Sequence, residues 1–403
     1  MDLILLLDLD DTCLGNSMET FIPAYLQALG DYLSDHFPPE KLAAALLSST
    51  QDMFANTCPD RTLKDVFDQS FYPQLGIDPK EYQDMFDSFY EEEFPGLQKL
   101  TQFRPEAVEV VEEAIRRNYS IVIATNPLFP LTAIRQRLGW AGLDPEKYPF
   151  RLIPSYETAF FAKPNPAFYA ELLSRLGWPE GPVVMVGDNF EHDIAAARLF
   201  GFGTYWVTTN EHPPAKVTDT QSGYGPLKEL LSWIDSIPSS DLIPNFEDNR
   251  AKLAVLRSSP VALKAFSLEL DDVAQWIEHY QVGEWSFTEI LCHLRDVDQE
   301  INLPRVKKVL RETNPFVPGI DSDKWAEERL YFCQNGQQAL KDFNSARIEL
   351  IDILDGLSVE GWQQPARHAI FGPTNLKELV SIIVGHDRLH VRQAYAAVRG
   401  VEA

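Results

Sequence analysis

Residues 3–12 read LILLLDLDDT, and this segment decides the fold of the N-terminal part of the chain. It joins a short apolar run to a group of carboxylates, and such runs are typical of central strands in a parallel sheet. Ligands of these sheets bind beyond the carboxyl ends of the strands. Carboxylates crowded there repel one another unless a cation lies between them, which favours a metal site with an aspartyl nucleophile. The alternative is an ordinary turn followed by a helix N-cap.

The composition is that of a folded protein without affinity for polyanions. The 403 residues are enough for two or three domains, and fractions of 45% hydrophobic and 24% charged residues are ordinary. The formal net charge of −25 opposes binding to nucleic acids and anionic membranes, because both need a basic surface. The sequence has no apolar run of membrane-spanning length, no basic flank of a signal peptide, and four scattered cysteines. These features predict a cytoplasmic protein.

Strand-like and helical segments alternate in the first half of the chain. Further apolar runs of strand length lie at residues 120–125, 183–187 and 204–207. Segments with helical periodicity separate them, at residues 106–117, 131–138, 165–176 and 193–199. Strands that alternate with helices predict an α/β layer fold with a parallel sheet.

The other segments are predicted to be helical. Residues 17–100 have helical periodicity without a strand, so we expect a helical insertion between the first strand and the rest of the sheet. Residues 236–248 contain two prolines and small polar side chains, which predicts a linker. Four helical segments then predict an all-α four-helix bundle: 261–280, 288–311, 339–357 and 376–398. The expected domains are an α/β core of residues 1–16 and 101–235, the insertion, and a bundle of residues 249–403.

Reactive side chains occur at several predicted strand ends and before one helix. They are Asp8 and Asp10, Thr125 with Asn126, Lys163, and Asp188 with Asp193. One carboxylate can attack phosphorus while a second protonates the leaving oxygen and later deprotonates water. A hydroxyl and an ammonium group can hold the phosphate oxygens, and Mg²⁺ prefers carboxylate and carbonyl ligands. The set is therefore suited to phosphoryl transfer.

These residues resemble the haloacid dehalogenase (HAD) superfamily. The sequence DLDDT at residues 8–12, then Thr125, Lys163 and GDNFEHD at residues 187–193, are similar to that family's four motifs in order. The resemblance covers roughly residues 1–235, and residues 17–100 lie where the family has its helical cap. It implies a Rossmann-like α/β core with a cap.

The resemblance also implies a role for each matching residue. Asp8 matches the nucleophile and Asp10 the general acid and base. Asp8, the Asp10 carbonyl and Asp188 match the Mg²⁺ ligands, with Asp193 in a supporting or water-mediated position. The remaining matches, expected to bind phosphate and assist catalysis, are Thr125 and Lys163, with Asn126 beside them.

The presence of Asp10 distinguishes between the reactions known in this family. Its dehalogenases use no acid–base carboxylate two residues after the nucleophile, so Asp10 favours a phosphatase or a phosphomutase, of which the phosphatase is the commoner. A small phosphorylated substrate is compatible with the acidic chain, because a bound divalent ion inverts the local potential. Four aromatic residues of the insertion are either substrate contacts or cap core: Phe21, Tyr25, Phe54 and Phe89.

The C-terminal half has a second cluster of chemical interest. His386 and His390 are four residues apart, on one face of a predicted helix, which suits a single metal ion. His293 lies about two turns inside another helix, behind a predicted capping box. Glu289 and Asp387 could support these ligands. The alternative is a solvated or partly buried polar pair. His368 has no such pattern and is expected to be structural or on the surface.

This half resembles the DinB/YfiT-like four-helix bundles over about residues 249–400. The resemblance is carried by WS at 285–286 ahead of His293, WAEER at 325–329 and GHDRLHVRQ at 385–393. It implies a divalent metal, zinc or nickel, held by three histidines: His293, His386 and His390. Some members of this family are thiol-dependent transferases or isomerases.

We therefore expect a Mg²⁺-dependent phosphatase joined to a metal-binding bundle, with a small phosphorylated substrate and no nucleic-acid or membrane partner. Two alternatives concern the bundle. It could carry the main chemistry as a metal- and thiol-dependent transferase. It could instead be non-catalytic, serving as a homodimer contact or a ligand-binding module.

Overall fold

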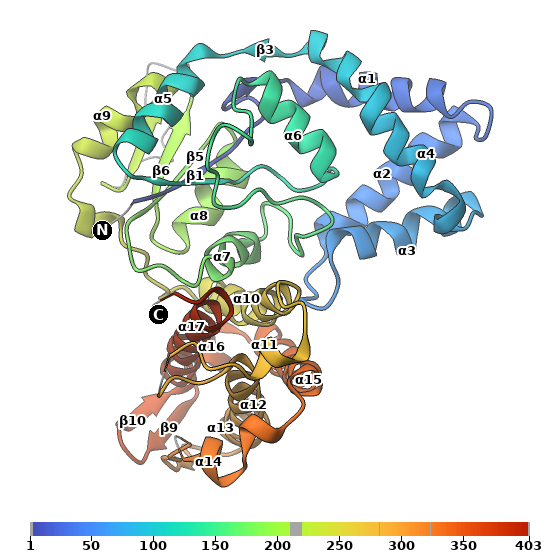
Figure 1. The fold of residues 1–403 in the computed structure, drawn as a ribbon. Helices are drawn as coiled ribbons and strands as arrows, with labels where there is room; N and C mark the ends of the chain where they lie inside the picture. Colours follow the sequence, from blue (N-terminus) through green and yellow to red (C-terminus); the bar gives the residue numbers. More distant parts are fainter. Residues whose placement is uncertain (1–2, 210–219, 282, 323, 402–403) are drawn as a thin grey trace. The chain divides into compact units, whose positions relative to one another are not determined.

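The computed structural model describes residues 3–209, 220–281, 283–322 and 324–401, and it divides into two compact units (Figure 1). The first unit comprises residues 1–57, 61–168 and 180–245, and the second comprises residues 58–60, 169–179 and 246–403. The division runs through α7 (Pro166–Arg175) and falls again between residues 245 and 246. Each unit is described by itself below.

The first unit is built on a five-stranded parallel sheet of order β4-β1-β5-β6-β7. Its strand β1, which lies between β4 and β5, is the apolar run at the start of the chain, and all four of its residues are buried. Burial on both faces explains why the strand is apolar throughout and does not alternate with polar residues. The strand bounds are β1 (Ile4–Leu7), β4 (Ser120–Ile123), β5 (Val183–Gly187), β6 (Gly203–Val207) and β7 (Ser222–Gly225).

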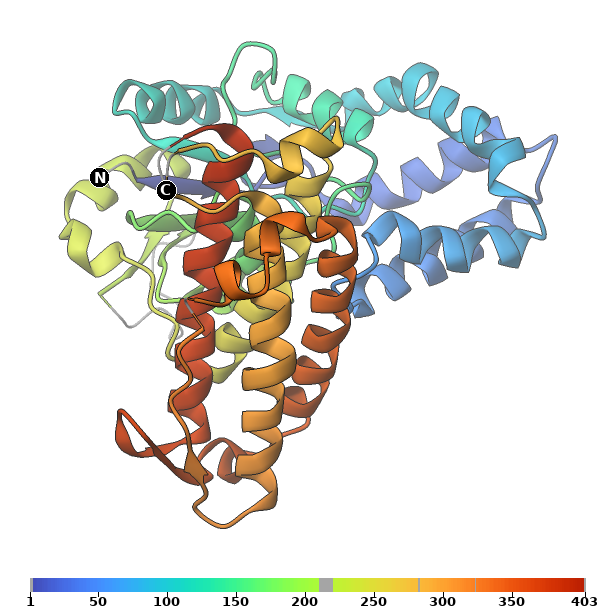
Figure 2. The same cartoon turned by 60° about the horizontal axis from the view of Figure 1, so that its bottom comes forward.

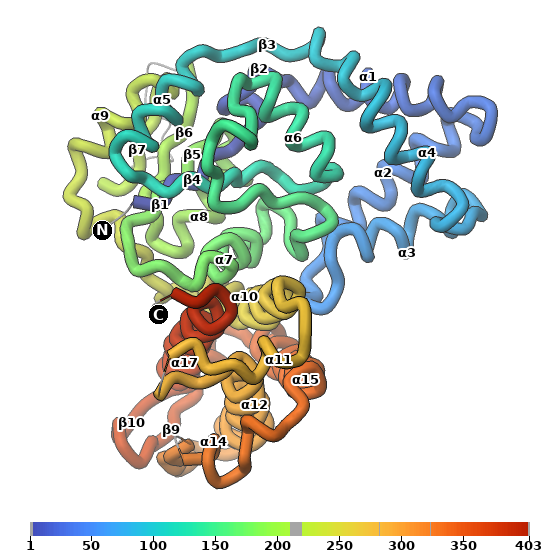
Figure 3. The backbone as a smooth tube through the Cα atoms, viewed as in Figure 1, coloured from blue at the N-terminus to red at the C-terminus, as the bar shows by residue number. Residues whose placement is uncertain are grey.

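Helices cover this sheet and complete an α/β core, as the alternating pattern predicted. The sheet packs in one apolar cluster with α5, α6 and α9, and the smooth trace of Figure 3 shows the connections between them. Leu242, in the segment predicted as a linker, is buried in the same cluster. The helix bounds are α5 (Pro105–Arg116), α6 (Leu131–Trp140), η2 (Phe190–Ala195), α8 (Ala196–Arg198), η3 (Leu227–Glu229), α9 (Leu230–Asp235) and η4 (Ser239–Leu242).

The insertion after β1 is helical. It consists of α1 (Met18–Tyr32), α2 (Pro39–Ala55), α3 (Leu63–Leu75), α4 (Pro79–Glu92) and η1 (Phe94–Leu100). A two-stranded antiparallel sheet of β2 (Leu14–Gly15) and β3 (Gln102–Phe103) joins the points where the chain leaves and re-enters the core. The insertion has its own aromatic core, in which Phe94 is fully buried and its ring lies 6.0 Å from that of Phe21.

The second unit is a four-helix bundle, and Figure 2 shows its long helices from the side. The long helices α10, α12, α15 and α17 pack on one another, and α12 continues through η5 into α13. A small sheet of order β10-β9-β8, which the sequence did not indicate, accompanies them. The long elements are α10 (Asn249–Ser267), α12 (Phe287–Val297), η5 (Asp298–Asn302), α13 (Leu303–Arg311), α15 (Gly336–Asp355) and α17 (Leu376–Arg399). The short ones are α11 (Val273–Ile277), β8 (Phe316–Val317), α14 (Trp325–Glu328), η6 (Tyr331–Cys333), α16 (Val359–Trp362), β9 (Pro365–His368) and β10 (Gly372–Asn375).

The prediction of a first bundle helix at residues 261–280 was wrong in its bounds. The helix begins at Asn249, because the Asp248 side chain caps it by accepting a hydrogen bond from the Arg250 backbone, and it accommodates Pro260 in its interior. It ends at Ser267, and α11 is a separate short helix. Among the described residues, no helix combines the length and the apolar character that a bilayer crossing requires.

A buried ion cluster connects four elements of the bundle: α10, η5, α15 and α17. The guanidinium of Arg347 on α15 donates to Asp298 Oδ2 over 2.7 Å and to Asp387 Oδ1 over 2.9 Å. All three side chains are buried, and Ser259 Oγ on α10 donates to Asp387 Oδ2 over 2.7 Å. Buried charges are tolerated only when they are paired, so this cluster fixes the register of α10, α15 and α17.

Replacing Arg347 with Met tests this cluster. The change leaves two buried carboxylates without their cation, so we expect a loss of about 3–5 kcal/mol in the stability of the second unit. Hydrogen exchange measured by mass spectrometry should accelerate in peptides of α10, α15 and α17. Glu349→Gln, on the same helix but in an exposed ion pair with Lys307, is the matched control and should change exchange little. Equal protection in Arg347→Met and the parent protein would contradict the role of the cluster.

Candidate functional site

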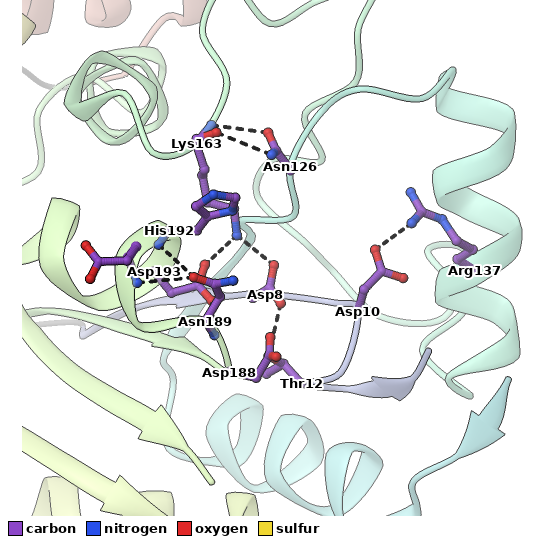
Figure 4. Close-up of polar contacts among 11 residues, drawn as sticks. Asp8, Asp10, Thr12, Asn126, Arg137, Lys163, Asp188, Asn189, His192 and Asp193 are labelled. Carbon is purple, nitrogen blue, oxygen red and sulfur yellow. Dashed lines mark hydrogen bonds and ion pairs between the residues drawn. The ribbon is translucent and has the colours of Figure 1, made fainter. Parts of the chain in front are cut away.

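The predicted catalytic residues of the first unit meet at the carboxyl ends of neighbouring strands. Asp8 directly follows β1, Thr125 follows β4 and Asp188 follows β5. Since β1 pairs in parallel with both β4 and β5, these three ends lie at one edge of the sheet. Figure 4 shows Asp8, Asp188 and Lys163 grouped at this edge.

The centre of the group is an ion pair network around Lys163. Its Nζ lies 2.7 Å from Asp8 Oδ1 and 2.6 Å from Asp193 Oδ1, and all three side chains are buried (Figure 4). Thr12 Oγ1 donates to the other oxygen of Asp8 over 3.0 Å. Thr12 Oγ1 also lies 3.5 Å from Asp188 Oδ1, so Asp8 and Asp188 face the same hydroxyl. Thr12 was quoted in the sequence motif but given no role.

The electrostatics favour an additional cation. Burial raises the pKa of Asp8 to about 6, although Lys163 opposes the shift. Burial, reinforced by the charges of Asp8 and Asp193, raises the pKa of Asp188 to about 7. Burial alone would lower the pKa of Lys163, but Asp193 and Asp8 outweigh it and keep that pKa above its ordinary value. One ammonium group therefore does not neutralise the cluster.

The carboxylates fit a hard divalent cation. Asp8, Asp188 and Asp193 each offer an oxygen within 4.8 Å of the others. Oxygen ligands from two or three carboxylates, completed by water, are what Mg²⁺ takes in proteins, and its charge would relieve the repulsion that raises the two pKa values. Asp193 is engaged with Lys163 and accepts from the Asn189 backbone over 2.9 Å, which agrees with a supporting position.

A steric constraint explains why the motif GDNFEHD begins with a glycine. A Cβ atom at Gly187, the last residue of β5, would lie 2.2 Å from Asp193 Oδ2. Only a residue without a side chain lets the Asp193 carboxylate reach the strand end. Asn189 holds the following turn, because its Oδ1 accepts from the backbone N–H groups of Glu191 and His192.

Thr125 and Asn126 lie as the sequence predicted, but they differ in their contacts. Thr125 is buried and lines the cavity over the site. Asn126 also lines it, but its Oδ1 accepts from the Lys163 backbone N–H over 3.1 Å. Asn126 therefore positions the segment that carries Lys163.

Asp10 is turned away from Asp8 (Figure 4). Its Oδ2 lies 2.5 Å from Arg137 Nη1, and its Oδ1 accepts from Asn16 Nδ2 over 2.7 Å. Arg137, on α6, is buried and its guanidinium lies over the ring of Phe129. Arg137 and Asn16 were not among the site residues predicted from the sequence. Arg137 is one of two arginines on α6, and no motif marks it.

A cavity of about 640 Å³ opens above the carboxylates within the first unit. It is lined by the core site and by α1, α2, α3 and α4 of the insertion. Of the four aromatic residues singled out in the sequence, Tyr25 and Phe54 line it, whereas Phe21 and Phe89 are fully buried in the core of the insertion. A cavity of this size can enclose a drug-sized ligand.

The three histidines of the second unit also come together. His386 Nε2 lies 3.0 Å from His293 Nε2 and 3.1 Å from His390 Nε2. Burial, with the neighbouring imidazoles adding to it, lowers the pKa of His293 to about 2 and that of His386 to about 3. These two rings are therefore neutral, and three nitrogens that converge on one point form a set that fits a divalent transition metal.

The described contacts of His390 include residues other than the two carboxylates suggested from the sequence. His390 Nδ1 lies 2.7 Å from Gln393 Oε1, and the ring of Trp285 stacks on His390 at 5.7 Å. Gln393 was part of the quoted motif, and its i+3 spacing from His390 could have identified it. The carboxylates of Glu289 and Asp387, suggested from the sequence as supports for the ligands, are hydrogen-bonded to other side chains among the described residues.

Each of these two carboxylates binds elsewhere. Glu289 accepts from Ser286 of its own capping box, and Asp387 pairs with Arg347. His368 is buried on β9, where its Nδ1 accepts from the Ile370 backbone, as expected of a structural residue.

Two protein families match this chain. Residues 4–201 match the haloacid dehalogenase-like hydrolase family, and residues 256–394 match the DinB superfamily. A phosphoserine phosphatase of Thermus thermophilus is 27% identical over 158 residues, which are 39% of this chain and 59% of that protein. The haloacid dehalogenase-like hydrolase domain-containing protein 3 of Danio rerio is 29% identical over 90 residues, 22% of this chain and 35% of that protein. The chain thus spans about 59% and 35% of the length of these two curated relatives.

Solved structures give the same two likenesses. An HAD phosphatase from Thermococcus onnurineus is 22% identical with a TM-score of 0.38, covering 58% of this chain and 98% of that one. YfiT from Bacillus subtilis, described as a probable metal-dependent hydrolase, is 19% identical with a TM-score of 0.35, covering 39% of this chain and 91% of that one.

The two family matches confirm the resemblances read from the sequence. The N-terminal part of the chain is similar to haloacid dehalogenase-like hydrolases over residues 4–201, and its C-terminal part is similar to the DinB superfamily over residues 256–394.

Proposed function

We propose that the first unit is a Mg²⁺-dependent phosphatase that hydrolyses a small phosphorylated metabolite through an aspartyl-phosphate. The observation that carries this proposal is the position of Asp8, which is buried at the strand end with Lys163 Nζ 2.7 Å from one of its oxygens. The named activities of the similar phosphatases agree with it. The residues of the core are 1–16 and 101–235, with residues 17–100 as the cap, and the C-terminal bundle follows residue 248.

The proposed reaction has two displacements. An oxygen of Asp8 attacks phosphorus, the bond to the leaving oxygen breaks, and Asp10 donates a proton to that oxygen. Asp10 then takes a proton from water, which attacks phosphorus and breaks the bond to Asp8, releasing inorganic phosphate. Lys163 and Thr125 hold the phosphate oxygens. Asp8, the Asp10 carbonyl and Asp188, with Asp193 in support, would hold Mg²⁺, which would supply charge neutralisation at phosphorus.

Asp10 has to turn from Arg137 towards Asp8 in order to act on the leaving oxygen. The ion pair with Arg137 keeps its carboxylate in place until then. A carboxylate at this position is what a phosphatase needs and a carbon–halogen hydrolase does not, so the proposal keeps phosphate-ester hydrolysis as the reaction.

Asp8→Asn tests the nucleophile. The amide cannot form the acyl phosphate, so we expect at least a thousandfold drop in kcat for a general substrate such as 4-nitrophenyl phosphate, on the order of the effects seen for essential catalytic groups. The circular dichroism spectrum should be unchanged. Hydrolysis at the parent rate would contradict the assignment of Asp8.

Gly187→Ala tests the steric constraint at the end of β5. The new Cβ would collide with the Asp193 carboxylate, so we expect loss of most phosphatase activity in a protein that still folds. Gly139→Ala is the matched control, because Gly139 on α6 has open space around the position of a Cβ. Its activity should equal that of the parent protein. If both variants are equally active, the constraint does not exist.

For the second unit we propose a divalent transition metal, zinc or nickel, held by His293, His386 and His390. The convergence of their Nε2 atoms supports this site. The bundle can serve one of two functions. It can catalyse a metal- and thiol-dependent transferase reaction at this site, or it can be a non-catalytic homodimer contact or ligand-binding module. The four cysteines form no disulfide with one another, which agrees with a cytoplasmic location for the protein.

His386→Ala combined with His390→Ala removes two of the three ligands. We expect purified protein to lose its transition metal, measured by inductively coupled plasma mass spectrometry, while phosphatase activity persists. His279→Ala is a control, because His279 is exposed and lies outside the cluster. A metal content unaffected by the double substitution would rule out the three-histidine site.

A further inference from the structure

The cavity above Asp8 has two chemically different ends. The core end carries the carboxylates, Lys163 and Arg137. The end formed by residues 17–100 is mostly apolar and aromatic. The side chains that line it there include Ile22, Tyr25, Leu46, Phe54, Phe67 and Phe86. In the reaction proposed above, phosphorus must lie at the core end next to Asp8, so the alcohol part of the substrate has to occupy the apolar end.

The apolar end has no cation to receive a second anionic group. Within residues 17–100, all of which the structure describes, no lysine or arginine lines the cavity, and the charged side chains there are Glu19 and Asp87. Both carry negative charge. A carboxylate or second phosphate on the substrate would meet repulsion there with no compensating ion pair.

The cations of the core end serve the phosphate end of the substrate. Lys163 is paired with Asp8 and Asp193 and holds the phosphate in the proposed reaction, and Arg137 is paired with Asp10 until Asp10 turns to the leaving oxygen. The remaining Nε and Nη2 atoms of Arg137 are buried within the protein, so they are not open to a ligand. His192 also lines the cavity, and it lies at the core end, next to Asp193.

The polar groups at the apolar end include two neutral hydroxyls, which also favour an uncharged substrate group there. The hydroxyls of Tyr25 and Tyr90 lie 2.7 Å apart and bond to each other. Burial raises the pKa of Tyr25 to about 12 and raises that of Tyr90 well above its ordinary value, so both remain protonated. Their rings are stacked at 6.4 Å and offer apolar surface on which a ring or an alkyl chain can pack.

From this distribution we infer the substrate class of the site, which rests on the phosphatase function proposed above. The substrate is a phosphate monoester of an uncharged, largely apolar alcohol of the size of an aromatic ring or larger. Burying such a group against apolar side chains is favourable by about 25 cal/mol per Å², whereas a second anion would be buried unpaired. Phosphate esters of small charged alcohols, such as phosphoserine, fall outside this class.

Two esters of the same shape test the inference: 4-methylphenyl phosphate and 4-carboxyphenyl phosphate. They differ by one negative charge, and the carboxylate does not make the phenol a poorer leaving group. We expect kcat/KM to be at least ~10-fold higher for the methyl ester with the Mg²⁺-loaded full chain, because a buried unpaired charge costs more than 1.4 kcal/mol. Phosphoserine should be hydrolysed more slowly still.

The outcomes separate the two proposals. Equal or faster hydrolysis of the carboxylate ester would overturn the substrate class while leaving the phosphatase function intact. Failure to hydrolyse any of the esters would contradict the phosphatase function itself, and the substrate class with it.

A pair of variants on one helix tests whether charge in the cavity is the cause. Asp87 on α4 lines the cavity, and Asp84 on the same helix is exposed and does not. Asp87→Asn should narrow the preference for the methyl ester by at least twofold, because it removes a negative charge from the wall. Asp84→Asn should leave the preference unchanged. Equal ratios in both variants would show that the cavity charge does not select the substrate.

Discussion

The site of the first unit depends on the ammonium group of Lys163, which lies between two buried carboxylates. Its contacts of 2.7 Å with Asp8 and 2.6 Å with Asp193 allow like charges to be buried together at the end of a sheet. Because the same cluster also includes Asp188, one positive charge is not enough to neutralise it. In the proposed function, this unbalanced charge attracts a divalent cation and, with that cation, a phosphate group.

Much of this site could be predicted from the sequence, since several of its residues directly follow segments with the pattern of a strand. Asp8 and Asp188 follow apolar strands, and parallel strands bring their carboxyl ends together. Arg137 could not be found in this way, because its contact with Asp10 spans 127 positions and depends on how α6 packs. The need for glycine at residue 187 likewise depends on a close approach in three dimensions.

The fold, like the site, could be predicted from the sequence only in part. The strands and the insertion follow from periodicity, but the start of α10 does not. The segment predicted to be helical begins at residue 261, whereas α10 begins at Asn249 and contains Pro260 in its interior. In the second unit the spacing of His386 and His390 predicted their shared helix face. It did not predict that Asp387, between them, pairs with Arg347 and supports the bundle rather than a metal ligand.

The central claim is that Asp8 becomes phosphorylated during turnover, and a chemical quench tests it most directly. Protein mixed with ³²P-labelled 4-methylphenyl phosphate and Mg²⁺ is stopped in acid within the first turnover, digested and mapped by mass spectrometry. The account predicts an acid-stable, hydroxylamine-labile phosphate on the N-terminal peptide at Asp8. Release of phosphate without label on Asp8 would contradict it.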